Sequence, residues 1–145
     1  MSKDNTRSSE RHQERQLAFE LLFEQIFRQD SIESIIEDAS AARDAEAGKY
    51  TRKLSFGVEE HLSEIDEMIE KHLKGWKMNR VSKVALTIMR ISVYEMLYEK
   101  SVPVSVSINE AVELAKEFAT KDDASFVNGV LGSAARTISE SGGEK

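Results

Sequence analysis

Three arginines recur at every fourth position near the start of the chain: Arg7, Arg11 and Arg15, with His12 beside them. In a helix, four-residue spacing keeps neighbouring guanidinium groups on one side, where they can bind successive phosphates. Two glutamates lie between the arginines and bring the local charge close to zero. The spacing alone is therefore a weak indication of phosphate binding.

Proteins that bind single-stranded RNA also use aromatic side chains on which bases stack. Phe126 is a candidate, because it falls in the expected first turn of the last helix beside Lys121 and Asp122. A core position is the alternative for this phenylalanine. The sequence by itself leaves both open.

Two glycines, Gly129 and Gly132, fall inside a helix-like apolar pattern. A glycine in a helix interior costs about 1 kcal/mol relative to alanine. This cost suggests a neighbour, either protein or ligand, packed close to the backbone. Tight packing between helices is the plainer of the two explanations.

The spacing of the histidines predicts no shared metal site. His61 and His72 are eleven residues apart, which separates them by about 16 Å along a helix axis. The chain has no cysteine, and it has no glycine-rich phosphate loop or nucleophile elbow. We therefore expect no enzymatic activity, no metal and no cofactor.

Composition predicts one soluble domain with a core of its own: 145 residues, 40% hydrophobic and 32% charged. The net charge of −6 argues against a general nucleic-acid coat protein, which would normally be basic. The charge is unevenly distributed, since six acidic residues in 59–70 precede five basic residues in 71–83. The lack of cysteine, of an apolar leader and of an 18-residue apolar run predicts a cytoplasmic protein.

Apolar periodicity predicts an all-α single domain of about six or seven helices. We expect it to span residues 10–139, between a flexible arm at 1–9 and a flexible tail at 140–145. Apolar residues step by three or four from 50 to 76, which predicts one long helix with Gly57 as a candidate bend and Trp76 in its apolar stripe. The segment 81–98 is apolar almost all round and predicts a central buried helix. Asp122 or Asp123 is suited to cap the last helix.

Several phrases closely resemble the NusB family of bacterial transcription antitermination factors, from about residue 11 to residue 135. They are RQLAFELLFEQ, FGVEEHLSEID, HLKGW, IMRISVYEM, INEAVELAKEF and FVNGVL, in matching order and spacing. The resemblance implies an all-helical fold of two small helical subdomains. It also implies binding of the boxA sequence of nascent RNA together with the ribosomal protein NusE. That complex helps RNA polymerase to resist termination, above all on ribosomal RNA operons.

By position, Arg11 and Arg15 match the family's arginine-rich first turn, and Asp122 and Phe126 match the region that approaches RNA. The candidate RNA-binding set is therefore Arg11, His12, Arg15, Lys121, Asp122 and Phe126. The chain departs from the family where Ser9, His12 and Gln13 replace common basic residues, and Ser125 stands where a lysine often precedes the phenylalanine.

The resemblance also places the contact with the ribosomal protein on Phe23 and on the face around Ala85 and Arg90. Ala85 and Leu86 replace charged residues that are common there. Arg90 lies in the most apolar segment, so its charge needs a partner. The alternative function is a helical adaptor that binds only protein, and either a monomer or a homodimer is compatible with the apolar faces.

Overall fold

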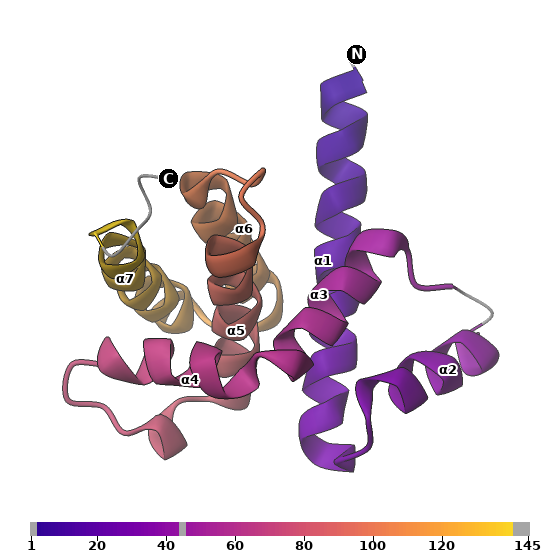
Figure 1. The fold of residues 1–145 in the computed structure, drawn as a ribbon, viewed down its shortest axis with the longest axis horizontal. Coiled ribbons are helices and arrows are strands. Elements are labelled where there is room, and N and C mark those ends of the chain that lie inside the picture. The colour runs from indigo at the N-terminus through magenta and orange to yellow at the C-terminus, as the bar shows by residue number, and fades with distance from the viewer. Residues whose placement is uncertain (1–2, 44–45, 141–145) are drawn as a thin grey trace. The chain divides into compact units, whose positions relative to one another are not determined.

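The computed structural model describes residues 3–43 and 46–140, which form seven α-helices and one short 3-10 helix and contain no strand (Figure 1). The helices are α1 (Lys3–Arg28), α2 (Ile32–Arg43), α3 (Lys49–Glu60), α4 (Leu62–Lys71), η1 (Met78–Arg80), α5 (Lys83–Tyr98), α6 (Val104–Phe118) and α7 (Lys121–Ile138). The chain divides into two compact units between residues 60 and 61. The prediction of an all-α fold is confirmed. None of the described helices has the length and apolarity of a membrane span.

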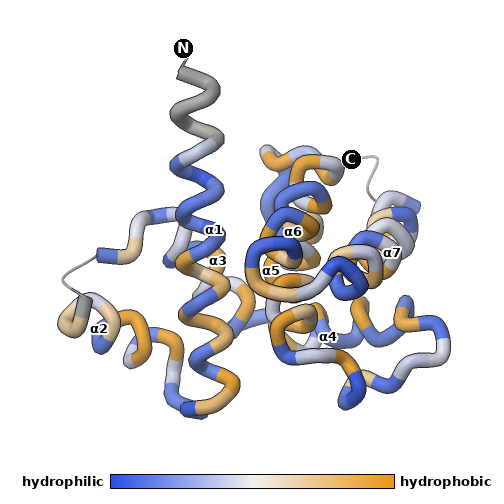
Figure 2. Tube along the Cα trace, turned by 180° about the vertical axis from the view of Figure 1, so that it is seen from behind, coloured by the Kyte–Doolittle hydropathy of each residue, from blue (hydrophilic) through white to orange (hydrophobic). Residues whose placement is uncertain are grey.

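The expected terminal segments are described only in part. Residues 1–2 and 141–145 lie outside the described residues, whereas α1 already begins at Lys3, within the segment expected to be an arm. In Figure 2 the early turns of α1 that carry colour are hydrophilic, and apolar residues follow along its second half. Only that second half therefore has the pattern needed to build a core.

The first unit consists of α1, α2 and α3, and carboxylates tie its helix starts to neighbouring helices. The Glu14 carboxylate of α1 accepts hydrogen bonds from the backbone N–H groups of Tyr50 (2.8 Å) and Thr51 (3.1 Å). Glu59 of α3 likewise accepts from the backbone N–H of Ile32 at 2.9 Å. The first N–H groups of a helix lack intrahelical partners, so Glu14 fixes the start of α3 to α1 and Glu59 fixes the start of α2 to α3.

The second unit is built around α5, which packs against α4, α6 and α7. α4 runs across the ends of α5 and α7 (Figure 1). The buried Glu95 of α5 accepts a hydrogen bond from Ser107 of α6 at 2.7 Å. The prediction of a central buried helix at 81–98 agrees with the observed burial of α5. The prediction that an aspartate caps the last helix is wrong, because the hydroxyl of Thr120 accepts from the N–H of Asp123.

The single long helix expected at 50–76 is also wrong, because the chain turns at His61 between α3 and α4. The candidate bend, Gly57, lies inside α3. The apolar stripe is continuous, but its halves fill two different cores: Leu54 belongs to the first unit and Ile65 to the second, and both are fully buried. The His61 ring stacks on Tyr98 of α5, with 4.2 Å between centroids. Apolar periodicity indicates which residues are buried, but it does not indicate which of two cores each residue enters.

Candidate nucleic-acid interface

The basic face of α1 is organised around one tyrosine. The guanidinium of Arg11 lies over the ring of Tyr50, 3.9 Å from its centroid, and that of Arg15 lies 5.6 Å from it. The predicted placement of the two arginines on one side of a helix therefore agrees with the geometry. Such cation–π contacts contribute about 0.5–2 kcal/mol.

The two arginines differ in exposure. Arg11 is exposed, His12 is half-buried, and Arg15 is only 4% exposed. Binding of successive phosphates by the spaced arginines would require Arg15 to be exposed as well, and its burial contradicts that expectation. The start of α3 packs against this side of α1, where Glu14 binds its first N–H groups and Tyr50 lies beside Arg15. Arg11 is thus the accessible member of the pair.

A second cluster lies in the second unit, where the segment after α4 meets α7. Phe126 is half-buried and contacts Trp76, with ring centroids 5.8 Å apart and ring planes at 64°. The Trp76 side chain is 57% exposed. Its expected place in the stripe of a long helix is wrong, because it follows α4 in a turn where Lys74 and Gly75 have positive φ.

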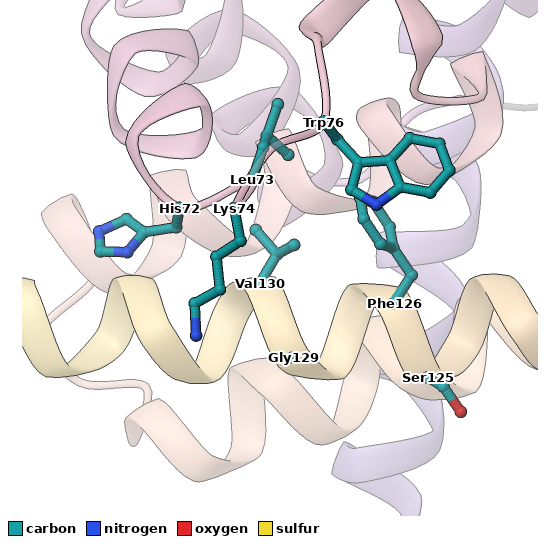
Figure 3. A pocket seen from close by; sticks show the side chains of 8 residues that line it. All are labelled: His72, Leu73, Lys74, Trp76, Ser125, Phe126, Gly129 and Val130. Atoms are coloured by element: carbon teal, nitrogen blue, oxygen red, sulfur yellow. The ribbon is translucent and has the colours of Figure 1, made fainter.

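Trp76 and Phe126 line a cavity of about 240 Å³. Its wall comes from the segment after α4 and from one face of α7 (Figure 3): His72, Leu73, Lys74, Trp76, Ser125, Phe126, Gly129 and Val130. Lys74 extends toward α7 in this view. Sequence reasoning missed Trp76 as a site residue. The available signal was a lone tryptophan inside a run, 71–83, that holds five basic residues and no acid.

Basic side chains lie near His72 beside this cavity. Burial lowers the pKa of His72, and the charges of Lys71, Lys74 and Arg136 lower it further. His72 Nδ1 lies 2.8 Å from the hydroxyl of Ser133. The neutral ring is therefore the favoured form, and the surrounding cations are available to attract an anion.

Gly129 and Gly132 have open surroundings. No heavy atom of the described residues outside the local helix backbone lies within 4 Å of a Cβ built at either position. The expectation that tight packing between helices of this chain explains the glycines is therefore wrong. Packing against a ligand or another protein stays a prediction.

The remaining candidate RNA-binding residues are Lys121 and Asp122, which are exposed at the start of α7, one turn before Phe126. They share a unit with the Trp76 cavity. Arg11, His12 and Arg15 belong to the other unit. The candidate RNA-binding residues thus form two groups, one in each unit of the chain.

The candidate protein-binding residues differ in accessibility. Phe23 is half-buried on α1, and its ring lies between Phe19 (centroids 5.5 Å apart) and Phe27 (5.1 Å). Phe27 is 61% exposed, so this row of rings reaches the surface. Ala85 is 1% exposed, because α5 is surrounded by its neighbours, and the expectation that it forms part of a docking face is wrong.

Arg90 is half-buried and has a partner within its unit. Its Nε and Nη2 donate to the two carboxylate oxygens of Asp66 at 2.9 and 2.8 Å. This two-bond pairing of guanidinium and carboxylate is a strong, oriented arrangement. Arg90 therefore fixes α5 to α4.

Comparison with known proteins identifies relatives of one kind. Residues 12–136 match the NusB family. A curated relative from Clostridium botulinum, named transcription antitermination protein NusB, is 49% identical over 83 residues, which cover 57% of this chain and 58% of the relative. The match thus spans less than two thirds of that relative's length.

Two solved structures agree with the fold. A structure of T. maritima NusB superposes with a TM-score of 0.78 at 37% identity, over 87% of this chain and 90% of that one. A structure of antitermination factors NusB and NusE in complex with dsRNA gives a TM-score of 0.78 at 27% identity, over 88% of this chain and 96% of the other.

Proposed function

This chain belongs to the NusB family, and from that membership we propose that it is a transcription antitermination factor. It binds boxA-type single-stranded nascent RNA together with the ribosomal protein NusE. It acts within the antitermination complex of RNA polymerase on ribosomal RNA operons. We place this function in residues 10–139 and in the cytoplasm, and we propose that it consists of binding without catalysis.

The observation that carries the proposal is the match to a structure of NusB and NusE with dsRNA over 88% of this chain. A relative with this fold is thus able to hold a protein and an RNA. NusE is therefore the partner that we expect for this chain as well.

The side chains offer RNA two kinds of contact. Arg11 is an exposed cation for phosphate, and the Phe126 ring lies beside the exposed Trp76. Phosphate contacts supply affinity in proportion to their number, whereas aromatic rings stack on bases. The net charge of −6 opposes attachment to RNA and predicts modest affinity without the partner.

Phe23 is the residue on which we place the contact with NusE, together with the exposed Phe27 beside it. Exposed aromatic side chains are common anchors of protein interfaces. The pairing of Arg90 with Asp66 and the burial of Ala85 leave these two residues little to offer a partner.

A titration tests the proposal directly. A fluorescently labelled boxA-type RNA and a shuffled RNA of equal length are titrated with the protein, in the presence and absence of NusE, and anisotropy is recorded. We expect preference for the boxA-type RNA, tighter binding with NusE, and a log–log salt slope of about −2 for roughly three neutralised phosphates. Binding of NusE without binding of either RNA would instead establish the adaptor function.

A further inference from the structure

We propose that the cavity lined by Trp76, Phe126 and Gly129 holds a single unstacked nucleobase of the bound RNA. The inference rests on the proposed RNA-binding function. It adds to that function a binding site for one base, here called the base receptor. Phe126 and Trp76 are its aromatic residues, and Gly129 leaves open space beside them.

The aromatic walls are arranged for a planar guest. The rings of Trp76 and Phe126 meet at 64° with centroids 5.8 Å apart, so they touch edge to face without stacking on each other. More than half of the Trp76 side chain is exposed. A ring face left exposed in this way can stack on a base, since every base presents a π-face. The cavity volume of about 240 Å³ is below the roughly 300–1,000 Å³ of pockets that enclose drug-sized ligands, which suits a smaller planar group.

The basic side chains beside the cavity can bind the phosphate of a nucleotide whose base lies in the cavity. Lys74 lines the cavity, and Lys71 belongs to the same basic run. Burial lowers the pKa of His72 at this place, and the charges of both lysines and of Arg136 lower it further. Cations beside an aromatic platform are the combination by which proteins bind single-stranded RNA, with phosphate on the cations and base on the rings. An apolar or basic protein segment would not use the cations.

Gly129 leaves open space on the face of α7 that lines the cavity. A glycine inside a helix costs stability relative to alanine, and no atom of the described residues outside its own helix backbone occupies the space that a Cβ would need. The cost therefore has no compensation from packing within the described chain. Gly129 lines the cavity and Gly132, three residues later on the same helix, does not. The open space at Gly129 lets a guest in the cavity approach the helix backbone.

The two glycines provide a matched pair of variants. Gly129→Leu places a side chain in the cavity, and Gly132→Leu makes the same change outside it. Thermal melts first establish that both variants fold, and Gly129→Ala with Gly132→Ala repeats the pair with a smaller side chain. We expect Gly129→Leu and Trp76→Ala to weaken binding of boxA-type RNA by about 5- to 150-fold, which is the effect of one lost base stack. Gly132→Leu should bind as the unmodified protein does.

Trp76 is the only tryptophan of the chain, so its fluorescence reports on the cavity alone. We expect RNA to quench this fluorescence with the same midpoint as the anisotropy titration, and Gly129→Leu to abolish the quenching. A set of RNAs that each lack one base then identifies the guest. Removing that base should weaken binding to the unmodified protein and have no effect on binding to Gly129→Leu.

The outcomes separate this inference from the proposed function. If the unmodified protein binds neither RNA, with or without NusE, the function and the base receptor are both overturned. If it binds RNA while Gly129→Leu and Trp76→Ala bind equally well, only the base receptor is overturned. Quenching of Trp76 by NusE alone, with weaker NusE binding by Gly129→Leu, would assign the cavity to the protein partner and likewise overturn the base receptor.

Discussion

Phe126 is either an RNA-binding residue or a core residue, and the two roles predict different losses of folding stability when the ring is removed. The ring is half-buried and its outer neighbour is the exposed Trp76. Truncating a fully buried phenylalanine costs about 3–5 kcal/mol of folding stability. Phe126→Ala removes one aromatic pair, worth about 0.5–1.5 kcal/mol, and part of the buried area. We therefore expect a loss of about 1–2 kcal/mol.

The loss of RNA binding should be at least as large. One base stack contributes about 1–3 kcal/mol, so Phe126→Ala should raise the Kd for boxA-type RNA by about 5- to 150-fold. Urea unfolding measures stability and anisotropy measures binding. Phe19→Ala is the matched control, because Phe19 is 3% exposed and should lose 3–5 kcal/mol of stability.

One result would refute this reasoning. If Phe126→Ala lost as much stability as Phe19→Ala, and its folded fraction bound RNA with unchanged affinity, Phe126 would be a core residue. The aromatic wall of the proposed receptor would then consist of Trp76 alone.

Three further predictions follow from the contacts and charges of single residues. Arg11→Ala should weaken RNA binding and change the folding stability by no more than about 1 kcal/mol. Arg15→Ala should lower the folding stability by more, because Arg15 is buried. Equal melting temperatures of the two variants would contradict this difference in stability. Asp66→Ala leaves the half-buried guanidinium of Arg90 without its carboxylate and should cost about 1.5–3 kcal/mol, measured by urea unfolding against Asp66→Asn. The pKa of His72 lies below its ordinary value of 6.5 in the folded protein, so the unfolded chain takes up the proton first as pH falls. The stabilising contribution of neutral His72 is thus complete above about pH 6.5 and is lost as the pH falls toward the lower pKa; urea midpoints between pH 5 and 8 should show this loss, and His72→Asn should reduce it.

Helix content was predictable from the sequence because apolar periodicity reports burial directly. The division between α3 and α4 was not, since the stripe runs through His61 without interruption while Leu54 and Ile65 enter different units. A turn without proline or glycine leaves no local signal. Here the competing tertiary contacts, including the stack of His61 on Tyr98, decide where the helix ends.

The candidate site was predictable only where a local pattern coincides with exposure. Arg11 and Phe126 are accessible as expected, at least in part. Arg15 and Ala85 are buried, because exposure depends on which neighbouring helix covers a face. Trp76 was overlooked because a tryptophan at the end of an apolar stripe normally belongs to the core.

An acidic chain can bind RNA if its charges are separated along the sequence, and this chain separates them at the end of α4. Residues 59–70 hold six acids, and residues 71–83 hold five basic residues without an acid. The basic run contains the turn that carries Lys74 and Trp76 to the cavity beside α7. Acidic surface elsewhere opposes nonspecific attachment to nucleic acid. Oriented contacts must therefore supply much of the affinity for RNA, and an aromatic cavity supplies one of them by stacking on a base.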